Sequence, residues 1–546
     1  MKNIITLLIF TVFSFTIQAQ TASKDWLLLD YTTDSVPGIS AKKAYAELLK
    51  GRKSVPVIVA VIDGGVDYMH EDLKDIMWHN PGEIPGNKKD DDKNGYVDDV
   101  YGWNFIGGAD GRNVDHDNLE VARIVKAYEY KYDKADPKKL TKKQRKEYAI
   151  YMKAKKELEE NRRKAAEKVA KYKERKDLAL HKLELVEKQM KEQGIGFDKI
   201  DSLDVSKDTL VEQGVNFIKR VRNMPDIKSI EDVRNMVIKT FKRPIDYFSE
   251  QILYHYNKDY DARKIVGDNY LDSSERYYGN PDVKGPDASH GTHVSGTIAA
   301  VRHNGIGMDG IADNVRIMAV RVVPNGDERD KDVANGIRYA ADNGASIINM
   351  SFGKSYSWDK KAVDKAVRYA EKKGVLMIHA AGNSSENNDV VTHYPTDKFE
   401  KRMWFCRKHA KSWMDIGANS YKNDSFFVAP FSNYGKEEVD LFAPGVAIYS
   451  TTPENTYASY QGTSMATPVV AGVAAVLKSY FPGLSAKQIK KILMESSVKK
   501  NLKVYVPGTE NKKVADFKDL SVSGGEVNLY NAIKMAIEKY GNKAAK

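Results

Sequence analysis

Four stretches of the chain place polar side chains of the kinds used in acyl transfer among small residues. They are Asp63-Gly64-Gly65-Val66-Asp67, His290-Gly291-Thr292-His293-Val294, Ala381-Gly382-Asn383 and Gly462-Thr463-Ser464-Met465-Ala466-Thr467-Pro468. A serine hydroxyl becomes a nucleophile when a neutral histidine accepts its proton and a carboxylate fixes the tautomer of that histidine. An amide group, together with the backbone N–H of the serine, could then donate hydrogen bonds to the oxyanion.

The predicted elements would bring these four stretches together. Residues 55–62 form a continuous apolar run rich in β-branched side chains, which is typical of a strand buried on both faces, and Asp63 follows it. The carboxyl ends of such strands are where open α/β sheets bind ligands. Ser464 opens an apolar run through Leu477 that indicates a fully buried helix, whose first turn leaves backbone N–H groups free.

Further along the chain, apolar strands alternate with helical patterns. We expect strands at residues 315–323, 346–351 and 375–380, separated by helices at 332–342 and 361–373. This alternation predicts an α/β fold with a mainly parallel sheet. Asn383 then follows the third of these strands.

Each candidate residue has an ordinary structural interpretation when it is taken alone. Ser464 could simply cap its helix, as serines before helices often do. Asp63 could be a turn residue, His290 a helix cap and Asn383 part of a loop. His290 and His293 stand three positions apart and could suggest a metal pair, but no third ligand is evident, so a structural role for His293 is preferred.

The four stretches, in this order, resemble the signature blocks of the subtilisin-like serine peptidases. The resemblance covers residues 24–108 and 265–535. It implies a three-layer α/β fold in which Asp63 orients His290, His290 is the general base, Ser464 is the nucleophile and Asn383 donates to the oxyanion. It also implies that Ser351, Phe352 and Gly353 form a wall of the peptide-binding groove, where a substrate lies as an added β-strand.

The 227 positions between Asp63 and His290 far exceed the few tens usual in that family. We assign the excess, residues 110–264, to an α-helical insertion, and residues 20–54, 55–109 and 265–540 to the peptidase domain. A capping box at Thr141 and a glycine at 194 predict a long helix between them, on the order of 75 Å, followed by helices near 208–222, 229–241 and 245–254 that Pro244 punctuates. The helix could project or fold back as a hairpin, and our hypothesis is that the insertion restricts or recruits substrates.

The positive charge of the chain is concentrated in that insertion. Residues 121–180 hold 21 lysines and arginines against 10 acidic residues, an excess equal to the formal net charge of +11. The chief alternative to an enzyme is therefore a scaffold whose basic insertion binds an anionic partner or surface. Interleaved glutamates and the absence of an aromatic–basic pattern favour a solvated helix face, and no nucleic acid is expected as a partner.

An acidic loop at residues 90–99 resembles the first half of a calcium-binding loop. Its candidate ligands are Asp90, Asp92, Asn94 and Asp98, with Gly95 at the turn. The closing glutamate is missing, because the twelfth position is Tyr101. A structural calcium site and a plain solvated turn both remain open, and the catalytic chemistry itself would require no cofactor.

Residues 1–19 have the form of a secretory signal peptide, with one lysine, an apolar stretch and Ala19 at the expected cleavage site. No later stretch is long and apolar enough to predict a transmembrane helix, and a single cysteine excludes an internal disulfide. About 35 residues separate this signal from the first strand, so no long processed segment is expected. The sequence thus predicts a secreted or periplasmic serine endopeptidase that cleaves proteins or peptides through an acyl-enzyme; no feature assigns its oligomeric state.

Overall fold

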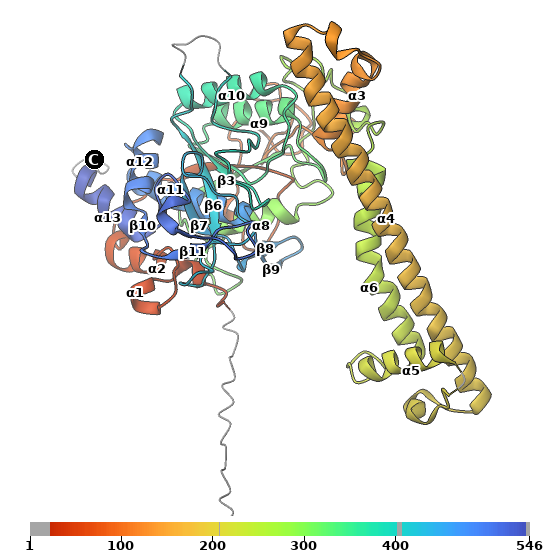
Figure 1. Cartoon of the computed structure of the whole chain (residues 1–546). Coiled ribbons are helices and arrows are strands. Elements are labelled where there is room, and N and C mark those ends of the chain that lie inside the picture. The colour runs from red at the N-terminus through yellow and green to blue at the C-terminus, as the bar shows by residue number, and fades with distance from the viewer. Residues whose placement is uncertain (1–21, 207, 401–406, 542–546) are drawn as a thin grey trace, which may run out of the picture.

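A nine-stranded sheet lies at the centre of the molecule (Figure 1). The computed structural model describes residues 22–206, 208–400 and 407–541, so the expected signal peptide at residues 1–19 lies outside the described residues. The strand order is β10-β13-β7-β6-β5-β4-β1-β3-β2, and every pairing except that of β10 with β13 is parallel. The strands are β1 (Val57–Asp63), β2 (Gly102–Asn104), β3 (Val315–Arg321), β4 (Ile347–Met350), β5 (Leu376–Ala380), β6 (Trp413–Asn419), β7 (Leu441–Pro444), β10 (Val498–Lys499) and β13 (Gly525–Glu526).

Both faces of this sheet are covered by helices, which makes three layers. Along β1, Val57, Val59 and Val61 face one core, and Ala60 and Ile62 face the other. The first core is closed by α8 (Ser289–Ala299), α11 (Thr463–Tyr480), α12 (Ala486–Ser496) and α13 (Leu529–Tyr540), and the second by α9 (Asp330–Asp342) and α10 (Lys360–Lys372). The expected α/β fold with a mainly parallel sheet is confirmed.

Two small sheets and an N-terminal segment complete this body. The hairpins pair β8 (Ile448–Thr452) with β9 (Thr456–Tyr460) and β11 (Lys503–Tyr505) with β12 (Val514–Asp516). The N-terminal segment carries the short helices α1 (Tyr31–Asp34) and α2 (Ala41–Lys43). Its residues Trp26, Leu27 and Leu28 are buried in the first core, so this segment is a structural part of the body.

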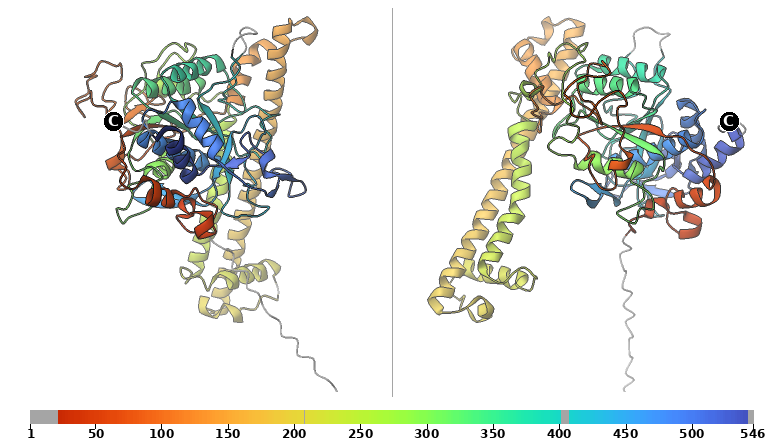
Figure 2. Two further views of the ribbon diagram at one scale, coloured as in Figure 1. Left: turned by 90° about the vertical axis from the view of Figure 1, so that its left-hand side faces the viewer. Right: turned by 180° about the vertical axis from the view of Figure 1, so that it is seen from behind.

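A helical arm leaves the body between β2 and β3, as Figures 1 and 2 show. It contains α3 (Glu120–Tyr132), α4 (Lys142–Gln193), α5 (Thr209–Val221) and α6 (Ile230–Glu250), and α7 (Arg263–Val266) follows it. The 52 residues of α4 correspond to about 78 Å. The expected projection and the expected hairpin both occur, because α6 returns antiparallel along α4: Glu187 pairs with Arg234 at 2.8 Å, and Tyr172 stacks on Phe248.

The limits of α4 follow from its sequence, whereas those of α6 do not. Thr141 and Gln144 form the predicted capping box, and Gly194 ends the helix in the left-handed conformation. Pro244 was expected to separate two helices, but α6 runs through it without interruption. Packing against α4 holds this part of the chain helical despite the missing N–H group.

No helix in the described part of the chain has both the length and the hydropathy required to cross a lipid bilayer.

Candidate active site

Asp63 and His290 are brought together where the end of β1 meets the start of α8. His290 Nδ1 donates to Asp63 Oδ1 at 2.8 Å, and the Gly64 N–H donates to the same oxygen at 2.7 Å. The close approach requires Gly291, because a Cβ there would lie 2.2 Å from the Gly65 carbonyl oxygen. Since Nδ1 carries the proton given to Asp63, Nε2 of the neutral ring holds a lone pair and can accept a proton.

Two opposing influences act on the charge of His290. Burial disfavours the imidazolium, but the negative charge of Asp63 and its hydrogen bond favour it, and together they raise the pKa of His290 above its ordinary value. The His290 side chain is 41% exposed, whereas that of Asp63 is 3% exposed. The attraction to Asp63 therefore outweighs the desolvation of a ring that still reaches solvent.

Ser464 lies in the first turn of α11 and is tied to the end of β4. Its Oγ donates to the Ser351 carbonyl oxygen at 2.9 Å, and Ser351 Oγ donates to the Ser464 carbonyl oxygen at 2.9 Å. Ser351 is 2% exposed and receives a further hydrogen bond from Asn349. Ser351 thus positions the turn that carries Ser464, a role that the sequence did not indicate.

Asn383 is oriented by the residue that precedes Ser464. The Thr463 backbone N–H and Oγ1 both donate to Asn383 Oδ1, at 2.8 and 3.0 Å, so the amide nitrogen is left for another acceptor. A Cβ on Gly462, whose φ is +150°, would lie 3.5 Å from Asn383 Nδ2 and 3.6 Å from Ser464 N. Both nitrogen atoms therefore lie beside Gly462, close to each other in the fold. The sequence did not predict a positioning role for Thr463 or Gly462, although both directly precede Ser464.

A cleft of about 340 Å³ opens beside this group, a volume in the range of small-ligand sites. Asp63, His290, Ser351 and Phe352 all line it. Gly353 is exposed and does not line this cleft. Of the three expected wall residues, Phe352 thus presents a side chain to the cleft, whereas Ser351 chiefly anchors Ser464.

His293 is separate from this group. It is fully buried, and its Nε2 lies 2.9 Å from the Ile448 carbonyl oxygen and 3.2 Å from that of Ala458. Burial lowers its pKa to about 4, so the ring is neutral. These contacts hold α8 against the β8–β9 hairpin, which is a structural role.

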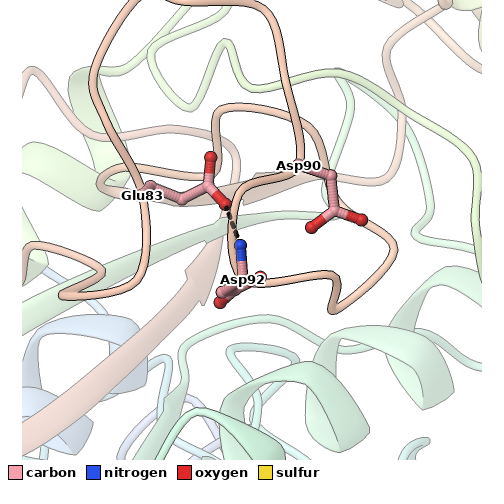
Figure 3. Close-up of side chains that lie close together, drawn as sticks. All are labelled: Glu83, Asp90 and Asp92. Carbon is pink, nitrogen blue, oxygen red and sulfur yellow. Dashed lines mark hydrogen bonds between the residues drawn. The ribbon is translucent and has the colours of Figure 1, made fainter.

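The acidic loop brings Asp90 and Asp92 together with Glu83, as Figure 3 shows. One carboxylate oxygen from each residue lies within 4.8 Å of the others. Glu83 is 8% exposed; its Oε1 accepts from the Asp91 and Asp92 N–H groups, while Oε2 is buried without a hydrogen-bond partner. Burial and the nearby aspartates raise the pKa of Glu83. Carboxylate oxygens are the ligands that Ca²⁺ prefers, so this group of donors fits that ion.

The other two candidate ligands of this loop are otherwise engaged. Asp98 accepts hydrogen bonds from the backbone N–H groups of Gly86 and Lys88, away from the cluster. Asn94 donates to Asp92 and Asp99, and its side-chain oxygen accepts from the Tyr96 N–H. Glu83 does not follow from the loop pattern, because the closing glutamate of a calcium loop is expected after the loop, whereas Glu83 precedes it.

The chain matches the model of the subtilase family over residues 55–519. It belongs to this family. Subtilisin DY of Bacillus licheniformis is 41% identical over 239 residues, which are 43% of this chain and 77% of that protein. Thermitase of Thermoactinomyces vulgaris is 38% identical over 246 residues, 45% of this chain and 75% of that protein. A protease of Pseudoalteromonas arctica PAMC 21717 has a solved structure that aligns with a TM-score of 0.38 and 27% identity, over 47% of this chain and 78% of that one.

This membership makes the chain a serine-type endopeptidase, a hydrolase whose substrates are peptides and proteins. The predicted family is therefore confirmed, and so is the presence of a long helical segment inside the family domain, since α4 lies within the matched residues.

Proposed function

We propose that this subtilase is a secreted endopeptidase in which Asp63, His290 and Ser464 act as the catalytic triad. The observation that carries the proposal is the 2.8 Å contact of His290 Nδ1 with a buried carboxylate at the rim of a cleft. In the proposed mechanism, substrate binding turns Ser464 Oγ from the Ser351 carbonyl toward His290. Nε2 then takes the hydroxyl proton as Oγ attacks the peptide carbonyl.

The tetrahedral oxyanion would be held by Asn383 Nδ2 and the Ser464 backbone N–H. Both nitrogen atoms lie beside Gly462, and Thr463 orients the amide before substrate arrives, so little reorganisation would accompany the reaction. His290 returns the proton to the departing amine, which leaves an acyl group on Ser464. Water activated by His290 then hydrolyses this ester and restores the enzyme.

The loop that contains Glu83, Asp90 and Asp92 would hold a structural calcium ion. Three carboxylates within 4.8 Å of one another would supply part of the six to eight oxygen ligands that Ca²⁺ prefers. The ion would neutralise this cluster and fix the loop, with no part in the proposed bond cleavage.

The residues that surround Ser464 favour this proposal over a scaffold that only binds anions through its basic arm. A scaffold would need neither the Asp63–His290 hydrogen bond nor an asparagine held by Thr463. Arm glutamates also pair with the basic residues, as in Arg163–Glu167 and Lys164–Glu160.

The test is covalent labelling of the purified full-length enzyme with a fluorescent phosphonate ester, together with hydrolysis of a mixed peptide library. We expect labelling at Ser464, and we expect Ser464→Ala to lose both the label and the activity. Ser459→Ala removes an exposed hydroxyl on β9 and serves as the matched control. Equal labelling of Ser464→Ala and the parent enzyme would overturn the proposal.

Secretion is tested by the N-terminal sequence of the protein recovered from the periplasm or the medium. Signal cleavage near Ala19 should leave residues 22 onward in place. Because Trp26 is fully buried and its indole donates to the Ala447 carbonyl oxygen, processing beyond it would remove part of the core. A mature N-terminus past residue 50 would contradict this expectation.

A further inference from the structure

The cleft beside His290 carries two acidic side chains that the proposed mechanism does not use. Asp115 and Asp287 line it together with Asp63. They come from distant parts of the chain, since Asp287 precedes α8 and Asp115 belongs to the segment that leads into the helical arm. Both are accessible: the side chain of Asp115 is 52% exposed, and Asp287 is exposed.

Hydrogen bonds fix the backbone at Asp115 and the carboxylate of Asp287. The Asn325 N–H donates to the Asp115 carbonyl oxygen at 2.8 Å, and the Asp117 N–H donates to the Asn325 carbonyl oxygen at 3.0 Å. These two hydrogen bonds form an isolated parallel bridge between His116 and Asn325, which also lines the cleft. Asp287 Oδ1 accepts from the Ser289 N–H at 2.8 Å, so its carboxylate is held one turn before His290.

One cation also lines the cleft, but its hydrogen bonds are directed elsewhere. Arg321 is 2% exposed, and its guanidinium donates to the Gly64 and Val114 carbonyl oxygens and to Asn104 Oδ1. Burial lowers its pKa to about 10, although the negative charges of Asp282, Asp115 and Asp287 act against that shift. The Asp115 carboxylate also lies 3.2 Å from His116 Nδ1, a contact that still leaves half of its surface in solvent. The accessible ionic groups on these two sides of the cleft are therefore carboxylates.

Besides the polar residues Asn325 and Ser351, the cleft has apolar walls. Val323 and Pro324 follow β3 on one side, and Phe352 follows β4 on the other. A long side chain with an aliphatic stem and a cationic end suits such a cleft, because the stem can lie along apolar surface while the charged end reaches the carboxylates. A short or acidic side chain would satisfy neither feature.

We propose that Asp115 and Asp287 make this cleft a subsite that selects substrates with a lysine or arginine adjacent to the cleaved bond. The inference rests on the proposed function and adds a substrate class to it. It also gives the arm a direct part in recognition, because one of the two carboxylates belongs to the segment that enters the arm.

The test compares peptides that differ only in charge at one position. Lysine, or its uncharged analogue norleucine, is placed in turn at each position near the cleaved bond of an otherwise identical fluorogenic peptide. We expect lysine to raise kcat/KM at one position and to have little effect at the others. Exposed ion pairs contribute about 0.2–1 kcal/mol, so each carboxylate should account for a roughly 1.4- to fivefold preference.

The variants Asp115→Asn and Asp287→Asn should each reduce the ratio of kcat/KM for the lysine peptide to that for the norleucine peptide by that factor. The double variant should bring the ratio close to one. Asp75→Asn, which neutralises an exposed aspartate outside the cleft, is the matched control and should keep the parent ratio. Raising the salt from 0.05 to 0.5 M should weaken the preference, because the carboxylates are exposed.

Two outcomes would overturn the inference: the absence of a preference for lysine over norleucine at every position, or a lysine preference that survives in the double variant. A variant that loses activity equally on both peptides would show a structural role for that aspartate instead. Failure of the proposed function is distinguishable, since it would abolish labelling of Ser464 and cleavage of every peptide in the set.

Discussion

Lys354 joins the groove wall to the first helix of the arm, and its removal should weaken both. Its Nζ lies 2.7 Å from Glu120 Oε2 at the start of α3 and 2.9 Å from Asp330 Oδ1 at the start of α9. It also donates to the Glu328 carbonyl oxygen at 2.7 Å. Since Lys354 directly follows Phe352 and Gly353, the substitution Lys354→Met tests whether this contact stabilises the cleft and the arm together.

The expected loss of Tm in Lys354→Met follows from the burial of the three charged side chains. The side chains of Lys354, Glu120 and Asp330 are 1%, 0% and 5% exposed, so methionine would leave two buried carboxylates without this cation. Breaking a buried pair from one side costs about 3–5 kcal/mol. With an unfolding entropy of about 2.1 cal/mol/K per residue, a chain of 546 residues has roughly 1.1 kcal/mol/K, so the Tm should fall by about 3–5 °C.

The assay is calorimetric unfolding in a Ser464→Ala background, which prevents self-digestion. Lys539→Met is the matched control, because Lys539 pairs with Glu495 at 2.7 Å while both side chains stay more than 40% exposed. An exposed pair contributes at most about 1 kcal/mol, so the control should lose no more than about 1 °C. Equal Tm losses in the two variants would refute the reasoning. In the active enzyme, Lys354→Met should also raise KM for peptides.

Three further predictions concern titration and metal binding. Asp63→Asn should lower kcat and shift the acid limb of the kcat/KM profile to lower pH, because the charge that raises the pKa of His290 is gone. An acid limb at unchanged pH would contradict the pairing of Asp63 with His290. Burial raises the pKa of Glu328 to about 8, so native stability should decline as pH rises from about 4.5 through 8, and Glu328→Gln should flatten that decline in Tm. Removing calcium with a chelator should lower the Tm of the parent enzyme. The loss corresponds to about 2.7 kcal/mol if the free calcium concentration was 100 times its Kd. The Tm of Glu83→Gln should fall less, and an equal fall in both proteins would exclude Glu83 as a ligand.

Much of the sheet could be predicted because its strands are buried on both faces. Their apolar runs are continuous, and three of them were placed within two residues of β3, β4 and β5. The limits of α4 could also be predicted from the local sequence, since Thr141 and Gln144 form one capping box and Gly194 ends the helix. The four signature blocks were recognisable because each combines a reactive side chain with small neighbours, and small residues are what permit the close approach seen at Gly291.

The contacts that were missed join residues far apart in the chain. The reciprocal hydrogen bonds of Ser351 and Ser464 span 113 positions, and no local pattern signals them. Glu83 joins the acidic loop only because the chain folds back on itself there. Pro244 was misjudged for a related reason: its local preference is to interrupt a helix, but α6 packs along α4 and continues through it.

The arm can be inserted at this point because both of its ends close against the same stretch of the body. At its entry the Leu119 N–H donates to the His255 carbonyl oxygen at 2.9 Å, and His255 Nε2 lies 3.2 Å from Asn325 Oδ1. After its exit Arg263 pairs with the buried Asp332 at 2.7 Å. With the two ends adjacent, the entropic cost of the long excursion grows only slowly with its length. The same closure sets the root of the arm beside the cleft, so Asp115, in the segment that enters the arm, comes to line the place where a substrate chain is proposed to bind.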